Sequence, residues 1–182
     1  MEPAELPPMQ KVRAVKDRPD WAITGAKGRD PNFISSIYID PIEEEVFNLH
    51  LEQKHKQIEA NEVRFKSLLL EDADIAIVAF GTAGRIAQSA IRQAREEGVK
   101  VGLLRPISLY PYPYEAIAIL AQQVKRILVV EMNGGQMVED VRLGVEGRVP
   151  VDFYGRMGGV VPLPDEVYEQ IRLSYDKIAA GV

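Results

Sequence analysis

The chain has 182 residues, of which 46% are hydrophobic, and it carries a formal net charge of −5. This length and composition suit one globular domain with a sizeable appendage, and the acidic balance argues against nucleic acid as the main partner. The sequence contains no cysteine, which excludes disulfides, thiolate zinc sites, cysteine nucleophiles and cysteine-held iron–sulfur clusters within these residues.

Neither a membrane span nor a signal peptide is predicted. No apolar run approaches a length of about 20 residues, which a bilayer-spanning helix needs. The first residues, MEPAELPPMQ, are acidic and proline-rich, unlike the basic and apolar start of a signal peptide. A reducing compartment is compatible with the lack of cysteine, so we expect a cytoplasmic protein with no membrane partner.

Residues 1 to about 35 form a proline-rich segment with little periodicity. This pattern predicts an extended strap without a core of its own. Trp21 is unusual in a free tail, so we expect the strap to lie on the main domain or on something absent. We also expect the chain to begin at a cut inside a longer protein.

Asp40 and Pro41 mark the start of a long predicted helix. Asp40 suits the N-cap, Pro41 suits the first helical position, and the glutamates that follow favour the helix dipole. A broken apolar stripe extends the prediction to about Leu70, with a polar middle that indicates a projecting arm or a partner-facing helix. His50 and His55 do not share a helix face as a metal-binding pair would, so we expect solvated or capping histidines.

A β-α-β unit follows and organises the rest of the chain. Its first strand is apolar on both faces, which is typical of a central parallel strand buried on both sides. A helix with an alanine- and isoleucine-rich face comes next, and a glycine suits its left-handed C-cap. The predicted order is strand, tight turn, helix, cap and strand, over residues 75–80, 81–84, 85–97, 98 and 100–104.

The remaining elements continue the alternation of strands and helices. Three prolines stiffen the loop over residues 105–113, which lies at the carboxyl end of a strand, where sites collect in open α/β sheets. This pattern predicts a three-layer α/β fold with a mostly parallel sheet. The further predictions are helices over 114–123, 136–143 and 164–180, strands over 126–131 and 149–154, and glycine turns over 133–135 and 155–159.

Familiar nucleotide-binding and nucleophile motifs are missing. Gly81 and Gly84 follow a strand and open a helix, but they lack the G-x-G-x-x-G spacing of a dinucleotide site. Two interpretations of these glycines remain: a simple tight turn, and a helix N-terminus that accepts an anion. Neither a P-loop nor a G-x-S-x-G sequence occurs.

Glu131 and Arg156 are candidate site residues because both stand at glycine-rich turns. Glu131 could act as a catalytic acid, or it could pair with Arg105 or Arg156 or cap the turn at Asn133. Arg156 could bind an anionic group or a neighbouring subunit, or form a structural ion pair. These residues alone do not make an active site, so we predict no catalytic, cofactor-binding or metal-binding residue in this chain.

The order of four motifs resembles one family. ADIAIVAFGT, GLLRPISLYPYP, VVEMNGGQM and GRMGG occur in that order. They are similar to the C-terminal part of the alpha subunit of 2-oxoacid:ferredoxin oxidoreductases of the 2-oxoisovalerate or 2-oxoglutarate type. That part is itself similar to the transketolase C-terminal domain. The resemblance covers roughly Trp21 to Ile171 and implies a transketolase C-terminal-like domain over residues 71–182, preceded by the strap and arm over 1–70.

The resemblance implies an enzyme that oxidatively decarboxylates a 2-oxoacid, with branched-chain 2-oxoisovalerate favoured. Such an enzyme uses thiamine diphosphate and Mg²⁺, passes electrons through iron–sulfur clusters to ferredoxin and releases acyl-CoA. The cofactors would lie outside this chain, between the N-terminal domain of the alpha subunit and a beta subunit, with gamma and delta subunits or ferredoxin as further partners. The chain would then serve assembly and would be inactive alone.

Motif residues are therefore expected to shape loops and interfaces. Loops locked by proline and glycine make stiff docking surfaces, and Tyr110, Tyr112 and Tyr114 are predicted interface anchors unless they pack on their own domain. Two alternatives stay open: a free-standing small-molecule or anion-binding regulatory module, and the equivalent domain of a lipoamide-linked 2-oxoacid dehydrogenase. The motif residues are Arg105, Pro106, Pro111, Pro113, Glu131, Asn133, Gln136, Arg156, Gly158 and Gly159.

Overall fold

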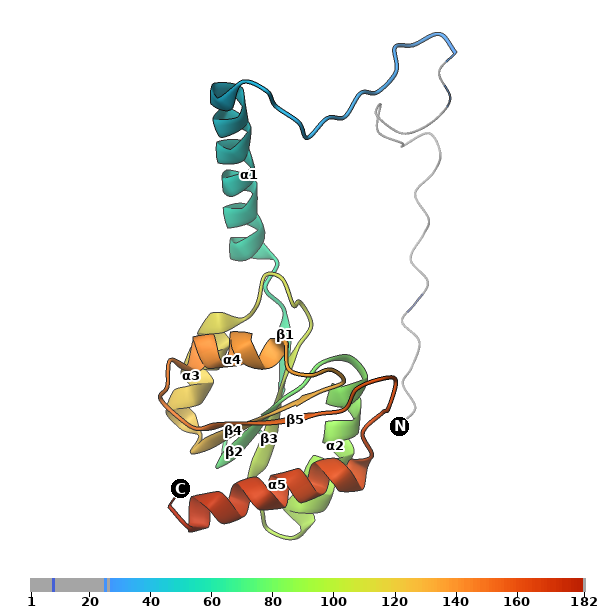
Figure 1. Ribbon diagram of the computed structural model, residues 1–182. Coiled ribbons are helices and arrows are strands. Elements are labelled where there is room, and N and C mark those ends of the chain that lie inside the picture. Colours follow the sequence, from blue (N-terminus) through green and yellow to red (C-terminus); the bar gives the residue numbers. More distant parts are fainter. Residues whose placement is uncertain (1–7, 9–24, 26, 182) are drawn as a thin grey trace. The chain divides into compact units, whose positions relative to one another are not determined.

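The computed structural model describes Pro8, Gly25 and residues 27–181 (Figure 1). Trp21 and most of the predicted strap therefore lie outside the described residues. The described chain divides into two units, one within residues 27–54 and the other over residues 55–181. In the described part of the chain, no helix has the length and apolar character that crossing a membrane requires.

The larger unit is built on a five-stranded sheet with the order β1-β3-β2-β4-β5. β1 pairs with β3 in the antiparallel direction, and the other neighbouring strands are parallel. The predicted mostly parallel sheet is thus confirmed, with one antiparallel strand at its edge. The strands are β1 Phe65–Leu68, β2 Ile75–Val78, β3 Val101–Pro106, β4 Arg126–Glu131 and β5 Val151–Gly155.

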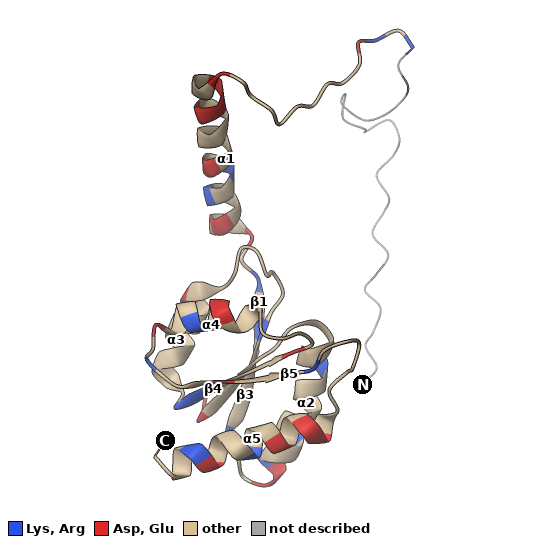
Figure 2. Cartoon of the chain, in the orientation of Figure 1, with Lys and Arg blue, Asp and Glu red and all other residues tan. Residues whose placement is uncertain are grey.

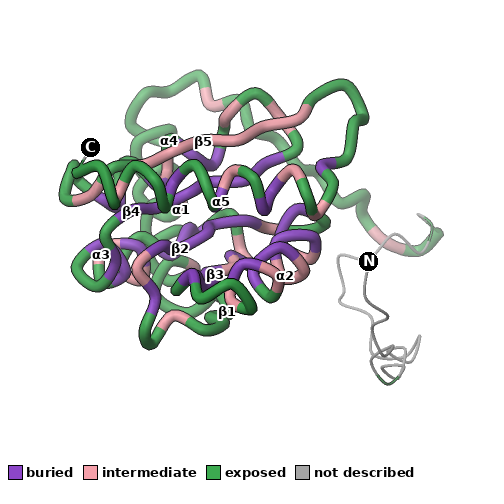
Figure 3. Tube along the Cα trace, turned by 90° about the horizontal axis from the view of Figure 1, so that it is seen from below, coloured by how far each residue is buried: buried purple, intermediate pink, exposed green. Residues whose placement is uncertain are grey.

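Helices cover both faces of this sheet, so the three-layer prediction is also confirmed (Figure 1). α2 (Gly81–Glu96) and α5 (Pro164–Ala179) lie on one face, and α3 (Tyr114–Gln123) and α4 (Met137–Val145) lie on the other. The central strands are the most deeply buried part of the unit (Figure 3).

The unbroken apolar run of β2 follows from this layering. Successive side chains of a strand point to opposite faces of the sheet. Ile75 and Ile77 pack against α2 and α5, whereas Ala76 and Val78 pack against α3 and α4. All four residues are fully buried. A strand covered on both faces needs apolar residues at every position.

The helix that begins at Asp40 is shorter than its sequence predicts. The N-cap is confirmed, because Asp40 Oδ1 accepts a hydrogen bond from Ile42 N at 2.8 Å. However, α1 spans Pro41–Asn61, so the prediction of a helix to about Leu70 was wrong. Phe65–Leu68 instead forms β1, because its backbone pairs with β3. This tertiary pairing overrides the local helical pattern.

The glycines after β2 do not bracket a tight turn either. α2 begins at Gly81, which has a φ of 55°. Gly84 lies within the first helical turn, where an added Cβ would stand 2.9 Å from the Ala79 carbonyl oxygen. Only Ala79 and Phe80 separate β2 from α2. The predicted left-handed cap at the other end is confirmed, since Gly98 has a φ of 86°.

Asp152 of β5 joins the sheet to α5 and gives a pH-dependent contribution to stability. Arg126 Nη1 lies 3.1 Å from its Oδ1, Lys177 Nζ lies 2.8 Å from Oδ1, and Ser174 Oγ donates to Oδ2 at 2.8 Å. Burial would raise the pKa of Asp152, but hydrogen bonds from Lys177 and Ser174 and the Arg126 charge outweigh it. The pKa therefore lies below its ordinary value of 3.8.

Replacing Asp152 with asparagine should lower the free energy of unfolding at pH 7 by about 1–3 kcal/mol. Because the folded-state pKa is depressed, the carboxylate stabilises the fold above the unfolded-state pKa, and that contribution is lost as pH falls through the folded-state pKa. The difference between wild type and Asp152→Asn should thus shrink below about pH 4. Urea unfolding followed by circular dichroism at several pH values measures it. The control Asp176→Asn, on α5, should change the free energy of unfolding by less than about 0.5 kcal/mol. A difference between wild type and Asp152→Asn that does not depend on pH would contradict the account.

Candidate functional site

A small cavity lies at the carboxyl ends of β2 and β4. The chain leaves β2 through α2 on one face of the sheet and leaves β4 through α4 on the other, which makes this edge a topological switch point. The cavity has a volume of about 150 Å³. It is lined by Phe80, Leu109, Tyr112, Glu131, Asn133, Gln136, Met137 and Asp140.

Four of the predicted site residues thus meet in one place: Tyr112, Glu131, Asn133 and Gln136. Sequence reasoning missed Asp140. The available signal was its spacing, because Asp140 follows Gln136 by four positions and shares its helix face.

Glu131 caps the N-terminus of α4. Its side chain is fully buried, and its two oxygens accept hydrogen bonds from Met137 N at 2.9 Å and Val138 N at 3.0 Å. Asn133 Nδ2 donates a third bond at 3.0 Å. A carboxylate at this position also complements the helix dipole. Since three N–H groups occupy the carboxylate, the capping interpretation describes Glu131 and the catalytic one does not.

Asn133 shapes the turn before α4 rather than capping the helix. Its Oδ1 accepts a hydrogen bond from Gly135 N at 2.7 Å, and Gly135 has a φ of 104°. The N-cap residue is Gln136, which makes no side-chain capping bond. The side chain that bonds the first N–H groups of α4 is instead the buried Glu131 carboxylate.

Tyr112 is buried and packs on its own domain, which is the alternative left open for the three tyrosines. Only 5% of the residue is exposed, and its ring packs edge-on against Tyr114 with the centroids 5.1 Å apart. Its hydroxyl is buried without a hydrogen-bond partner among the described residues. Burial, followed by the charges of Asp140 and Glu131, raises the pKa of this phenol above its ordinary value.

Tyr114 and Asp140 form a short hydrogen bond at the rim of the cavity. Tyr114 Oη donates to Asp140 Oδ1 at 2.5 Å. This bond, with smaller contributions from burial and from the Asp140 charge, raises the pKa of Tyr114 to about 12. Tyr114 remains 39% exposed, so it lies at the surface as predicted. The pair connects the start of α3 to α4.

The proline-rich loop also borders a larger groove of about 820 Å³. Tyr110 is 60% exposed, and its hydroxyl lies 2.8 Å from His55 Nδ1. His55 thus has a specific partner rather than being only solvated. The lining includes the acids Glu59, Glu115 and Asp140 and no lysine or arginine. Acidic positions occur on the last turns of α1 and on α4 (Figure 2).

Arg105 and Arg156 do not line the cavity. Arg105 lies on β3, opposite Lys66 of β1, and its Cδ approaches the space beside Gly84. Arg156 follows β5 and forms an ion pair with Glu166 at 2.8 Å. Neither arginine pairs with Glu131, whose oxygens bind N–H groups around the start of α4.

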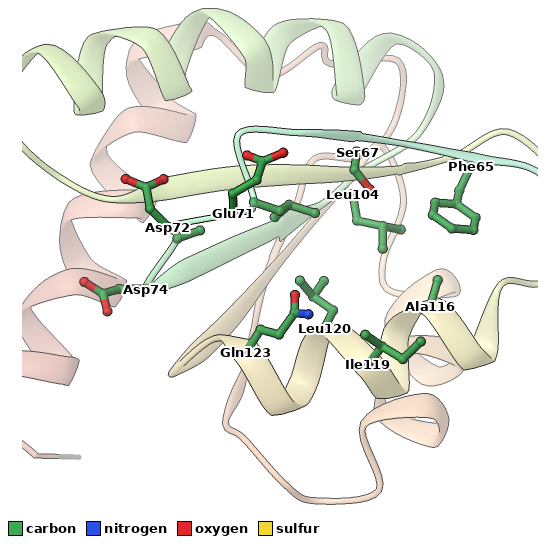
Figure 4. A pocket seen from close by; sticks show the side chains of 12 residues that line it. Phe65, Ser67, Glu71, Asp72, Asp74, Leu104, Ala116, Ile119, Leu120 and Gln123 are labelled. Atoms are coloured by element: carbon green, nitrogen blue, oxygen red, sulfur yellow. The ribbon is translucent and has the colours of Figure 1, made fainter.

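A further hollow, of about 670 Å³, lies between β1, the residues before β2, and α3 (Figure 4). Figure 4 shows acids at one end and apolar side chains such as Phe65 and Ile119 at the other. Two of the acids are already paired, Asp72 with Arg95 at 2.7 Å and Asp74 with Lys125 at 2.8 Å. None of the predicted site residues lines this hollow, which lies at the amino end of β2 rather than at the carboxyl edge where ligands bind.

The cavity and the groove offer hydrogen-bonding groups and apolar contact surface. Among the residues that the structure describes, no group of three or more histidines, cysteines or acids could hold a metal ion. The Glu131 carboxylate is occupied by N–H donors. The arrangement therefore suits recognition of another group.

Replacing Tyr112 with phenylalanine should raise the stability of the lone chain. A buried hydroxyl without a protein partner costs about 1–3 kcal/mol of desolvation free energy, so its removal should raise the free energy of unfolding by about 1 kcal/mol. Thermal unfolding followed by circular dichroism measures the change.

Tyr168→Phe is the matched control, because Tyr168 Oη donates to Glu97 Oε2 at 2.6 Å. This substitution should lower stability instead. Equal losses in the two variants would show that the Tyr112 hydroxyl is satisfied in the free chain.

The family match and the similar proteins found by comparison agree with one another. Residues 73–167 match the family described as pyruvate:ferredoxin oxidoreductase core domain II. The chain is 43% identical over 173 residues to the ketoisovalerate oxidoreductase subunit VorB of Methanothermobacter thermautotrophicus, covering 94% of this chain and 48% of that subunit. It is 35% identical over 101 residues to the 2-oxoglutarate synthase subunit KorA of Methanothermobacter marburgensis, covering 56% of this chain and 27% of that subunit. The chain thus spans about half the length of VorB.

Solved structures share the fold. The 2-oxoglutarate:ferredoxin oxidoreductase of Magnetococcus marinus matches with a TM-score of 0.64 and 21% identity, over 82% of this chain and 25% of that one. A split-gene transketolase, an inactive beta4 tetramer, matches with a TM-score of 0.55 and 21% identity, over 62% of this chain and 41% of that one. The likeness predicted between this domain and transketolase is confirmed at the level of the fold.

Proposed function

This chain belongs to the family of pyruvate:ferredoxin oxidoreductase core domain II, and on that premise we propose that it is an assembly domain of a ketoisovalerate-type enzyme. The domain would stand in the alpha subunit of a 2-oxoacid:ferredoxin oxidoreductase in the cytoplasm. It would hold the interface between that subunit's N-terminal domain and the beta subunit, with gamma and delta subunits or ferredoxin as further partners. The 43% identity to VorB over 94% of the chain carries this proposal.

The complete enzyme would convert 2-oxoisovalerate, coenzyme A and two oxidised ferredoxins into an acyl-CoA, CO₂, a proton and two reduced ferredoxins. The lone chain should not perform this reaction. Its lack of cysteine leaves no thiolate for an iron–sulfur cluster.

The residues present do not fit thiamine diphosphate either. The cavity of about 150 Å³ is smaller than cofactor sites, which occupy roughly 300–1,000 Å³. The groove is large enough, but Glu59, Glu115 and Asp140 would repel a diphosphate and no basic residue lines it. We therefore place the cofactors in the other parts of the enzyme.

The exposed face of the proline-rich loop supports an interface. Ile107 is 52% exposed, Leu109 46% and Tyr110 60%. Apolar and aromatic side chains gathered on a stiff loop are typical of docking surfaces. Because the loop lies at the carboxyl edge of the sheet, it is well placed to meet the domain that binds substrate.

Co-purification tests the proposal. The chain is co-expressed with the N-terminal part of the alpha subunit and with the beta subunit, and the mixture is separated by affinity and size-exclusion chromatography. We expect one complex that contains all the polypeptides, and no thermal shift when thiamine diphosphate and Mg²⁺ are added to the lone chain. A saturable shift of the lone chain without any complex would favour a free-standing ligand-binding module.

A further inference from the structure

We propose that the cavity at the carboxyl ends of β2 and β4 receives the guanidinium group of an arginine from a partner polypeptide. Residues that flank this arginine would lie in the adjoining groove. We identify the partner as another polypeptide of the same enzyme, which rests on the function proposed above. The residues of this chain that would hold the arginine are Tyr112, Gln136 and Asp140.

The cavity and the groove form one continuous surface. Leu109, Tyr112 and Asp140 line both of them. The cavity is small, with a volume of about 150 Å³, and both polar and apolar side chains line it, whereas the groove is larger, about 820 Å³. A small recess beside a larger groove suits a side-chain head group and the segment that carries it. Side chains that fill pockets at the centre of an interface commonly contribute most of its binding energy.

The negative charge of this surface favours binding of a cation. Glu59, Glu115, Glu131 and Asp140 line it, and neither lining set contains lysine or arginine. N–H groups of the chain itself already occupy the Glu131 oxygens. Asp140 differs, because only its Oδ1 has a partner, the Tyr114 hydroxyl, in the contacts of the described residues. Its second oxygen can accept a bond from an incoming cation.

Tyr112 is an independent indication that a ligand enters the cavity. Its hydroxyl is buried, has no hydrogen-bond partner among the described residues, and lies close enough to Asp140 and Glu131 to feel both charges. Buried polar groups are normally satisfied. A donor from a partner molecule would give this phenol oxygen a hydrogen bond to accept.

Arginine fits these acceptors better than lysine does. A guanidinium group presents five N–H donors in a fixed plane and no acceptor. It can therefore bond the free Asp140 oxygen, the Tyr112 oxygen and the Gln136 side-chain carbonyl together. The rings of Phe80 and Tyr112, which also line the cavity, offer faces on which a guanidinium can stack.

The groove lining indicates which residue types should flank the partner arginine. Val63 is 39% exposed, Ile119 49% and Leu109 46%, so the groove wall presents apolar surface. We expect the partner arginine to be flanked by apolar residues that cover this wall. The acids at the groove margin, Glu59 and Glu115, favour further basic residues in the same segment.

The test compares variants in the assembled enzyme. Asp140→Asn should weaken binding of the chain to its partner polypeptides by about tenfold or more, the usual effect of losing a hydrogen bond to a charged group. Tyr112→Phe should weaken binding as well, although it is expected to stabilise the lone chain. A structural role for the hydroxyl could not produce these two opposite effects.

Glu97→Gln is the matched control, because Glu97 also accepts a tyrosine hydroxyl bond but lies at α2, on the opposite face of the sheet. It should change binding by less than about twofold. If the wild-type chain does not assemble with the other polypeptides, the proposed function is wrong. If wild type assembles and both cavity variants bind the partner polypeptides as tightly as wild type does, only the arginine-binding role of the cavity is wrong.

Cross-linking identifies the occupant directly. A photo-reactive benzoylphenylalanine at Leu109, which lines both the cavity and the groove, should capture the partner segment in the assembled complex. We expect mass spectrometry of the cross-linked peptide to show an arginine flanked by apolar residues. A peptide without arginine, or one from a second copy of this chain, would overturn the proposal.

Discussion

Glu131→Ala should lower the free energy of unfolding by roughly 3–5 kcal/mol, because the substitution leaves several buried donors unsatisfied. Met137 N, Val138 N and Asn133 Nδ2 would all lose their acceptor. The start of α4 should then fray, and with it the wall of the cavity. Urea unfolding followed by circular dichroism measures the loss of stability, and amide hydrogen exchange locates it.

A graded series sharpens this test. Glu131→Gln keeps one acceptor oxygen but turns an NH₂ group toward the helix N-terminus. Its free energy of unfolding should therefore lie between those of wild type and Glu131→Ala. The control Glu139→Gln removes a carboxylate from the same helix, where Glu139 pairs with Arg142 at the surface. It should cost less than about 1 kcal/mol. Similar stabilities for Glu131→Ala and Glu139→Gln would contradict the capping role.

Gly102→Ala should destabilise the sheet by about 2–3 kcal/mol through overpacking. An added Cβ at Gly102 would lie 2.3 Å from the Leu69 carbonyl oxygen and 2.7 Å from the Leu69 carbonyl carbon. The backbone at Leu69 is not free to move, because Arg95 Nη2 donates to its carbonyl at 2.7 Å. β1 would have to separate from β3, and chemical unfolding would report the cost.

Gly134→Ala is the control for this overpacking. Its added Cβ would meet only the end of the flexible Met157 side chain, at 3.3 Å from the sulfur. The variant should therefore differ from wild type by less than about 0.5 kcal/mol. If Gly102→Ala and Gly134→Ala have the same free energy of unfolding, β1 can shift to accommodate the added Cβ, and the overpacking account is wrong.

The inner elements of the fold were predictable because their patterns are local. The predicted bounds of α3 and β4 agree with the structure, at residues 114–123 and 126–131. A helical apolar stripe marks the first, and an unbroken apolar run marks the second. The edge strand β1 was not predictable in this way. All four of its residues are exposed, so their strand conformation depends on pairing with β3.

The sequence indicates part of the cavity lining but not its hydrogen bonds. Glu131 ends β4, and Asn133 and Gln136 follow it within five residues, so their position along the chain brings them to one edge of the sheet. Their role as site residues stays a prediction. No periodicity governs the loop around Tyr112, so tertiary packing alone decides that Tyr112 is buried and Tyr110 is exposed. The helix-capping bonds of Glu131 likewise depend on how α4 is placed over the end of β4.

Reconstituted activity is the measurement that tests the assembly role most directly. The N-terminal part of the alpha subunit and the other subunits are assayed with and without this chain for 2-oxoisovalerate-dependent and coenzyme A-dependent reduction of a viologen dye. We expect activity only when the chain is included, and none from the chain alone. Full activity without the chain, or activity of the lone chain, would contradict the assembly role.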